Sequence, residues 1–450
     1  MASRVIDHPA VPAINYPAFL PLLAGVLAII PHYTIINAWF TGWDTLSLIN
    51  SARLESLADI FTKPLMYGTG FTADGLYFRP IISLSFWLQY RVFGMESMGY
   101  HAISLVQHAL ASALVAVVGQ RLHRWGGLAG LAFALHPMLA ANVQAPERGQ
   151  DVLATVFLLA AWLLLTDNRP GWGLAAYAAA LGSKEIALLF LPVGLWLLWP
   201  RRRWIAGLLT ITVTWWGWRA AVIGGVGGYR DATWHPGNLI STPIHYVAFL
   251  FWPWGIGQQI ASSGQLLLSV VLTGTIIVAL WQARSAIVAR LFLLLAMPML
   301  LYSMTIMQYW YFYLPAALGA LLLTVAIINL SERRRWPGLT IMLAVVAALV
   351  ISLWRPTGWA EAGRQNLVII NQVGKLAETM APGDTLYLCN APGLAPDGTG
   401  VVMMMDHSIR SYFDLTMAYP GVQIEYLDMD NTPAWPGYLR PIRPNLACWQ

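Results

Sequence analysis

Apolar runs of about 11 to 25 residues follow one another along the first 355 residues of the chain, and most approach the length of about 20 residues that a membrane-spanning helix needs. Only 10% of all residues are charged, against about 25% in soluble proteins, so most of the surface is expected to face hydrocarbon. The sequence therefore predicts an all-α polytopic membrane protein with about eleven transmembrane helices. The predicted spans are Tyr16–Phe40, Gly99–Gln120, Leu128–Val143, Asp151–Leu165, Trp172–Gly182, Glu185–Trp199, Trp204–Ile223, Leu266–Gln282, Ile287–Met304, Tyr311–Ile328 and Leu339–Leu353. The fifth and sixth are short, and one bent hairpin is the alternative for them.

Short basic clusters separate these runs, and they fall on one side of the predicted membrane. Because cytoplasmic loops are enriched in Lys and Arg, we expect a multi-pass plasma (inner) membrane protein with a cytoplasmic N-terminus and an extracytoplasmic C-terminus. The first apolar run lacks a small-residue cleavage site after it, so it is expected to be retained. A nucleic-acid-binding surface would gather its charge in one domain, and no nucleic-acid partner is predicted. The clusters are Arg121–Arg124, Asp167–Arg169, Arg201–Arg203, Arg284–Arg290 and Arg333–Arg335.

The longest segment between predicted spans, residues 41–98, contains two helix-like stretches. The first follows Asp44, which is well placed as a helix N-cap, and the second starts near Pro80, a residue favoured at helix starts. The second stretch has an apolar face rich in Trp and Tyr. Both are predicted to lie in the plane of the membrane interface, as the first extracytoplasmic loop of a transmembrane domain covering residues 1–355.

Polar spacing returns in residues 356–450. Helical periodicity at residues 361–380 and 408–419, together with strand-like runs at 385–390, 400–406 and 422–428, predicts a small extracytoplasmic α/β domain. Both cysteines of the chain, Cys389 and Cys448, lie in this segment. An oxidising compartment permits a disulfide between them, and two free thiols are the alternative.

Ionisable residues are rare, and those near the predicted outer membrane face come from four different segments. Such residues are candidates for function in a membrane protein, and their shared leaflet predicts one extracytoplasmic cavity. No metal-binding or nucleotide-binding motif is present, so a divalent metal has no support from the sequence, and the glycine-rich run at Gly224–Tyr229 is read as a flexible turn. The candidates are Asp44, Asp59, Arg79, His101, His136, Glu147, Arg148, Asp151, Lys184 and Glu185.

Five blocks of sequence resemble, in order, the GT-C membrane glycosyltransferases, above all the tetratricopeptide-linked O-mannosyltransferases and their bacterial relatives. The resemblance implies a GT-C-like fold and a sugar donor linked to polyprenyl phosphate, used at the outer membrane face. It also implies that the enzyme is an inverting hexosyltransferase. The acceptor would be a protein or a glycan, and the protein would lie in the lipid bilayer. The blocks are Tyr77–Val115, Leu131–Pro137, Glu147–Asp151, Gly182–Pro192 and Tyr311–Leu323.

The same resemblance implies that Asp44 is the general base, since an acidic residue of the first outer loop has that role in the family. An inverting transfer needs one carboxylate to take the acceptor proton while the lipid phosphate leaves. A helix N-cap and nothing more is the alternative for Asp44. Arg79 is a candidate phosphate ligand because a guanidinium matches phosphate geometry, and an interfacial anchor is its alternative.

The remaining candidates for donor-phosphate or substrate binding are His101, Arg148, Lys184 and Glu185. Lys184 and Glu185 are expected to pair with each other, although Lys184 also has the reach to bind a phosphate. For His101, as for His136, a hydrogen-bonded packing role competes with a role as ligand. Arg148 is expected to form a charge network with Glu147 and Asp151 that shapes the cavity.

Two positions depart from the family pattern. Relatives often have an acidic residue where this chain has Asn142, and an Arg where it has Trp310. The acidic pair that is frequent in the first loop is also absent, since Trp43 and Thr45 flank Asp44. A changed donor, a changed acceptor and lost activity are all consistent with these departures.

Two further functions compete with the glycosyltransferase prediction. An O-antigen-ligase-like transferase also uses lipid-linked glycans, but its large outer loop comes late in the chain, whereas the long loop here comes first. A lipid or sugar transporter, or a non-catalytic scaffold, is the alternative outside enzymes. Transporters frequently contain inverted repeats with interrupted helices, and no such internal symmetry is evident in the sequence.

Overall fold

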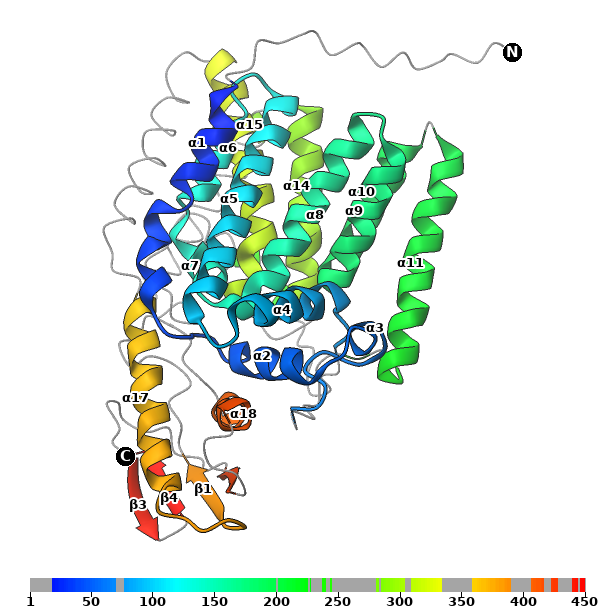
Figure 1. Cartoon of the computed structure of the whole chain (residues 1–450). Helices are drawn as coiled ribbons and strands as arrows, with labels where there is room; N and C mark the ends of the chain where they lie inside the picture. Colours follow the sequence, from blue (N-terminus) through cyan, green and yellow to red (C-terminus); the bar gives the residue numbers. More distant parts are fainter. Residues whose placement is uncertain are drawn as a thin grey trace.

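The structure is a computed structural model, and its helices form a bundle with a smaller unit at one end (Figure 1). It describes residues 18–69, 77–199, 201–225, 285–303, 309–333, 358–389, 406–416, 422–427, 439–443 and 446–449, with a few isolated residues between them. The predicted spans Leu266–Gln282 and Leu339–Leu353, the second outer segment except for a few residues, and most of the strand-like run at 400–406 lie outside these ranges. Most of the described residues are helical, which confirms the prediction of a mostly helical protein. The count of eleven spans stays a prediction.

The long helices of the bundle begin and end close to the predicted positions. In the described part of the chain, three helices are long and apolar enough to cross a membrane. A fourth span arises if the bent pair α1 and η1 is counted as one. The bundle elements are α1 (Phe19–Leu27), η1 (Ile30–Asn37), α5 (Ser97–Leu122), α6 (Leu128–Ala134), η2 (Pro137–Leu139), α7 (Ala140–Val143), η3 (Pro146–Arg148), α8 (Gly149–Thr166), α9 (Pro170–Ser183), η4 (Glu185–Phe190), α10 (Leu191–Leu198), α11 (Arg202–Ile223), α14 (Ala286–Tyr302), η5 (Tyr309–Phe312) and α15 (Tyr313–Arg333).

The single span predicted at Leu128–Val143 is wrong, because the chain is broken there into α6, η2 and α7. Pro137 begins η2, and a proline cannot donate the backbone hydrogen bond that would continue α6. The short elements that follow are buried at the end of the bundle that also holds the first loop. This break carries the chain to Glu147 and Arg148 in η3.

The first loop covers this end of the bundle, with α4 (Pro80–Phe93) lying across the helix ends and α2 (Thr45–Leu54) beneath it in Figure 1. A short α3 (Asp59–Thr62) joins them. Both predicted helix starts are confirmed, since Asp44 is the residue before α2 and Pro80 is the first residue of α4. Residues 45–52 of α2 are all buried, so this helix is covered on every side rather than exposed on one face.

The C-terminal part contains α17 (Trp359–Ala377), α18 (Asp406–Thr416) and a four-stranded sheet. The sheet has the order β2-β1-β4-β3, where β1 (Thr385–Cys389) pairs in parallel with β2 (Gln423–Leu427) and β4 (Leu446–Trp449), and β3 (Leu439–Arg443) is antiparallel to β4. The first two strands and both helices match the sequence prediction. The last two strands were not predicted, because Pro441 and Pro444 interrupt the strand pattern there.

Cys389 at the end of β1 is disulfide-bonded, and its backbone lies in register with that of Cys448, the second of the two cysteines in the chain. The C-terminal part also contacts the bundle end directly. The Asn366 amide of α17 donates to the Phe40 carbonyl at 2.9 Å. Close packing beside it requires a glycine, since a Cβ on Gly363 would lie 2.6 Å from the Trp39 carbonyl oxygen.

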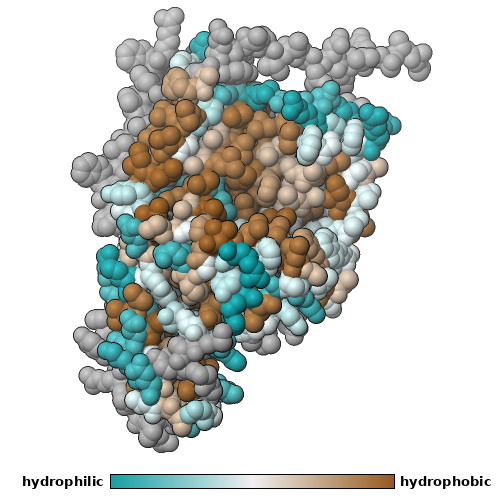
Figure 2. Space-filling model, in the orientation of Figure 1, coloured by the Kyte–Doolittle hydropathy of each residue, from teal (hydrophilic) through white to brown (hydrophobic). Residues whose placement is uncertain are grey.

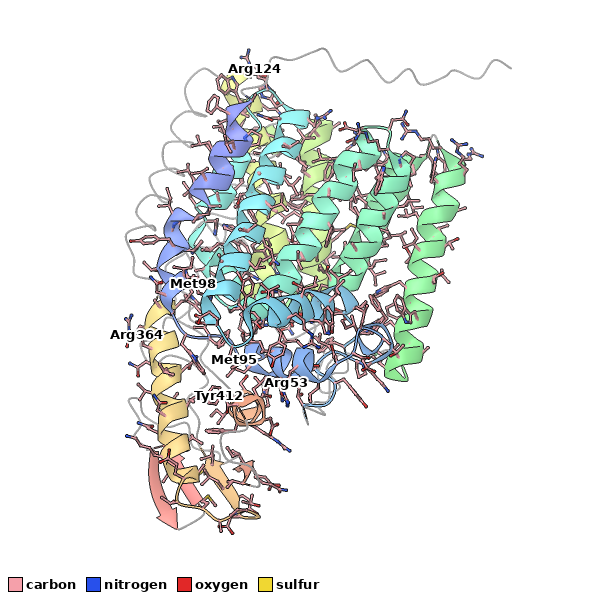
Figure 3. All side chains as sticks on the ribbon, in the orientation of Figure 1. Arg53, Met95, Met98, Arg124, Arg364 and Tyr412 are labelled. Carbon is pink, nitrogen blue, oxygen red and sulfur yellow. The ribbon has the colours of Figure 1, made fainter. Side chains whose placement is uncertain are left out.

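Figure 2 shows a broad hydrophobic surface over the helix bundle, bordered by hydrophilic residues at the end away from the C-terminal part. Large apolar side chains of the bundle helices, such as Leu22, Val106 and Val213, are exposed. An exposed apolar belt of this extent fits a bundle that faces lipid. Arg124 lies at one end of the molecule, and the first loop with the C-terminal part lies at the other (Figure 3).

Candidate active site

Asp44 is fixed at the bundle end by hydrogen bonds to η3. Its backbone N–H donates to Glu147 Oε2, and the Thr45 hydroxyl lies 3.3 Å from the same oxygen. The preceding Gly42 has a φ of 100°, and a Cβ there would lie 2.6 Å from Glu147 Oε2. Only glycine takes this backbone conformation at no steric cost, so the sequence Gly42-Trp43-Asp44 holds the loop against the carboxylate.

The Asp44 side chain makes no capping hydrogen bond to α2. Its Oδ1 instead lies 2.9 Å from Nε2 of His407, a residue of α18. Burial raises the pKa of the Asp44 carboxyl, whereas the hydrogen bond and charge of His407, and then the charges of Arg148 and Arg79, lower it, and its net pKa lies below the ordinary value. With 29% of its side chain exposed, Asp44 is an accessible carboxylate that stays ionised.

Arg79 precedes α4 and points into a buried ionic cluster. Its Nη2 lies 2.7 Å from Glu185 Oε2, its Nη1 donates to Gln150 Oε1, and its guanidinium sits 4.2 Å from the ring centre of Tyr77. Glu185 Oε1 is 3.5 Å from Arg219 Nη2, so one carboxylate lies between two guanidinium groups. The net charge of these three residues is therefore positive.

The predicted Lys184–Glu185 pair is wrong. Lys184 Nζ lies 2.5 Å from Asp151 Oδ1 and 4.5 Å from the ring centre of Tyr311, whereas Glu185 turns toward Arg79. Lys184 is in extended conformation between α9 and η4, so the side chains of consecutive residues point to opposite sides. Burial lowers the pKa of the Lys184 ammonium to about 8, although the Asp151 carboxylate opposes this shift.

The two departures from the family pattern lie next to each other. The Asn142 amide donates to the backbone carbonyl of Trp310 at 2.7 Å. The Trp310 ring lies 4.0 Å from the Arg148 guanidinium, and its edge contact with Trp43 has a ring-centre separation of 5.1 Å. Arg148 in turn pairs with Glu147 at 2.7 Å. The predicted network of Glu147, Arg148 and Asp151 is thus only partly present, because Asp151 pairs with Lys184.

The two histidines contact backbone groups. His101 lies in α5 with Nε2 3.4 Å from the Trp39 carbonyl oxygen. His136 lies where α6 ends, and its Nδ1 accepts from the Met138 N–H at 3.3 Å. Of the predicted site residues, the structure therefore brings Arg79 and Glu185 together in one cluster and joins Asp44 to Arg148 through Glu147.

Several buried polar atoms of the cluster have no hydrogen-bond partner among the described residues. These atoms are Asp151 Oδ2, Glu185 Oε1, and Nε and Nη1 of Arg219. A buried guanidinium with unused donors is costly unless a ligand or water satisfies it. The prediction did not include Arg219, although a lone Arg in the apolar run of α11 was the signal for it. His407 was missed as well, because nothing local in the tail indicates a contact with Asp44.

The arrangement combines two chemical functions at one end of the bundle. Arg79, Lys184 and Arg219 are buried cations suited to an anionic group, and Arg79 is near enough to Asp44 to lower the pKa of its carboxyl. Asp44 is an ionised carboxylate suited to accept a proton. No group of three or more His, Cys, Asp or Glu residues able to hold a metal occurs in the described ranges.

Sequence comparisons identify protein O-mannosyl-transferases as relatives. One from Caenorhabditis elegans is 26% identical over 183 residues, covering 38% of this chain and 26% of that protein. One from Drosophila melanogaster is 31% identical over 184 residues, covering 37% of this chain and 21% of that protein. The matches thus span about a quarter of the relatives' own length. No protein-family model matches the chain.

Among solved structures, the apo crystal structure of ArnT from Cupriavidus metallidurans superposes with a TM-score of 0.53. The match covers 90% of this chain and 89% of ArnT at 15% sequence identity, so it shows a shared fold. The sequence relatives are of the kind that the five sequence blocks resemble, and the shared fold agrees with that resemblance. The chain is a membrane protein with a GT-C-like fold, similar in part of its sequence to the protein O-mannosyl-transferases.

Proposed function

We propose that the protein transfers a sugar from a polyprenyl-phosphate carrier to a protein or glycan acceptor, with Asp44 as general base. The observation that carries this proposal is the placement of an accessible, ionised carboxylate near a buried cluster of three cations, of which Arg219 has unused donors. The names of the relatives favour mannose as the first sugar to test. Because the matches cover only about a quarter of these relatives, the identity of the donor and of the acceptor is part of the proposal.

In this proposal Arg79, Arg219 and Lys184 hold the donor phosphate. Asp44 takes the proton of an acceptor hydroxyl as the acceptor oxygen bonds to the anomeric carbon of the sugar. The bond from that carbon to the phosphate oxygen breaks, and the lipid phosphate leaves with both electrons. Attack opposite to the leaving phosphate inverts the anomeric centre, and one carboxylate suffices because the phosphate leaves without protonation.

The proposed topology has the N-terminus in the cytoplasm and the active site outside, in the plasma (inner) membrane. The basic clusters at Arg121–Arg124 and Arg201–Arg203 lie at the opposite end of the bundle from the first loop, which supports this orientation. Residues 1–355 would form the transmembrane domain with about eleven spans, and residues 356–450 a small extracytoplasmic α/β domain at the acceptor side.

A transfer assay in proteoliposomes tests the proposal. Purified protein is given polyprenyl-phosphate mannose with a panel of peptide and glycan acceptors, and the wild type is compared with Asp44→Asn. We expect wild-type transfer and a loss of about 10²- to 10⁴-fold in the variant, the usual contribution of a general base. Asn keeps the shape of the side chain and its ability to accept from His407, so folding should be retained.

Binding of polyprenyl phosphate separates this enzyme from the non-catalytic alternatives. Asp44→Asn should bind the carrier as the wild type does, since it removes the base and leaves Arg79 intact. Undiminished transfer by Asp44→Asn would exclude Asp44 as the base. Carrier binding without transfer to any acceptor would favour the transporter or scaffold.

A further inference from the structure

The C-terminal helix α18 docks on α2 at the candidate active site. The hydroxyl groups of Ser47 and Ser411 lie 2.9 Å apart, and the Ser47 hydroxyl also lies 3.3 Å from the His407 carbonyl. Ser408 donates to the Trp43 carbonyl, one residue before Asp44. Figure 3 shows Tyr412 of α18 close to α2, and its ring lies 5.7 Å from that of Trp39.

His407 is the residue of α18 that reaches Asp44. Its Nε2 lies 2.9 Å from Asp44 Oδ1, and its side chain is 13% exposed against 29% for Asp44. The histidine is thus the more buried partner, behind a carboxylate that is open to solvent. A contact between residues 363 positions apart in sequence ties the tail to the first loop.

We propose that His407 is a positioning residue for glycosyl transfer, holding Asp44 Oδ1 so that Oδ2 faces the acceptor hydroxyl. This inference rests on the proposed function, because it gives His407 a role in the reaction assigned to Asp44. It makes α18 part of the active site, and it places the acceptor at the seam between α2 and α18.

The proton balance follows from this geometry. His407 Nε2–H donates to Oδ1 throughout, and the acceptor proton goes to Oδ2 when the acceptor oxygen bonds to the anomeric carbon. A carboxylate held by a donor has a fixed orientation, which lowers the entropy lost on reaching the reactive geometry. When Asp44 is protonated, the exposed oxygen returns the proton to solvent, and the lipid phosphate departs unprotonated.

The charges around Asp44 come from each described element packed against it. His407 approaches from α18, Glu147 and Arg148 from η3, and Arg79 from the start of α4. Glu147 opposes ionisation of Asp44, whereas the others favour it. Removing His407 should therefore raise the pKa of Asp44. Because only the ionised carboxylate can act as a base, activity should then fall at a higher pH than in the wild type.

Three variants in the proteoliposome assay test this role, with kcat/KM measured against pH. His407→Ala removes the donor, His407→Gln keeps an N–H donor near the position of Nε2, and Thr416→Ala changes an exposed residue at the end of the same helix. His407→Ala should lose about 10- to 100-fold in kcat/KM, the range of a hydrogen bond to a charged group. Its acid limb should shift to higher pH.

His407→Gln should regain most of the lost rate, and Thr416→Ala should keep both the rate and the acid limb of the wild type. Binding of polyprenyl phosphate should be equal in all three variants. An acid limb that stays in place in both His407 variants would overturn the positioning role, whatever happens to thermal stability. Full transfer by Asp44→Asn would instead refute the proposed function and this inference with it.

Discussion

Arg79 and Glu185 form an ion pair with 2.7 Å between Nη2 and Oε2, although 106 residues separate them in the sequence. The pair joins the start of α4 in the first loop to the start of η4 in the bundle. Because Glu185 also faces Arg219 at 3.5 Å, its single negative charge leaves one positive charge uncompensated. This excess charge is the basis for assigning the donor phosphate to the cluster.

Replacing Arg79 with Lys should weaken carrier binding while the charge is retained. The guanidinium donates at the same time to Glu185 and Gln150, and an ammonium lacks this fixed fork. We expect the Kd for polyprenyl phosphate to rise about 10- to 100-fold, as for loss of a hydrogen bond to a charged group. Titration of detergent-solubilised protein by intrinsic Trp fluorescence measures it.

Arg364→Lys is the matched control for that titration. Arg364 is exposed on α17 and pairs with Glu361 of the same helix. Exposed ion pairs contribute about 0–1 kcal/mol, so this variant should bind the carrier like the wild type. Equal affinity of both Lys variants and the wild type would remove Arg79 from the phosphate site.

Carrier binding should weaken as the pH rises through about 8. Lys184 is protonated below the pKa of about 8 that burial gives it, and it is neutral above. The attraction between its ammonium and the phosphate is therefore present at low pH and lost at high pH, where Asp151 also remains as an uncompensated negative charge. Lys184→Arg stays charged, so its affinity should be flat over the same range. Parallel pH profiles for wild type and variant would contradict the assignment.

The sequence allowed prediction of the elements that a local pattern defines. The apolar run of α5 and the amphipathic period of α17 gave these helices nearly their observed bounds, and Pro80 marked the start of α4. Asp44 and Arg79 were identified because charges are rare in an apolar chain and because the family resemblance assigns a base to the first loop.

The partners of the charged residues could not be predicted, because pairing between residues far apart in the sequence leaves no local pattern. Lys184 and Glu185 looked paired as sequence neighbours, yet an extended backbone turns them to Asp151 and Arg79. Similarly, His407 reaches Asp44 only through the docking of α18 on α2. Such contacts are a property of the tertiary fold, and helical or strand period carries no information about them.

Cysteine labelling from the two sides of the membrane should confirm the proposed orientation. In a background with both native cysteines replaced, Arg202→Cys should react only after permeabilisation, and Arg364→Cys should react in intact cells. Both side chains are exposed, Arg202 at the start of α11 and Arg364 on α17. Labelling of Arg202→Cys in intact cells would contradict the proposed orientation and indicate the opposite one.

Asn142 and Trp310 occupy the positions where relatives are expected to have an acidic residue and an Arg. We expect the effects of restoring those two residues on stability to be coupled. The amide of one contacts the carbonyl of the other at 2.7 Å, and both side chains are buried. Trp310→Arg alone places a second guanidinium beside Arg148, and Asn142→Asp alone places a carboxylate against a carbonyl oxygen. Each leaves a buried charge without a partner, which is strongly destabilising.

The double variant should recover stability, because the two introduced charges lie close enough to neutralise each other. Residues in contact show interaction energies of about 0.5–3 kcal/mol, so the loss of thermal stability in the double variant should be clearly smaller than the sum of the single losses. Thermal unfolding in detergent measures all four proteins. If the losses add, the two positions are independent, and Trp310 must be explained by its contacts with Arg148 and Trp43 alone.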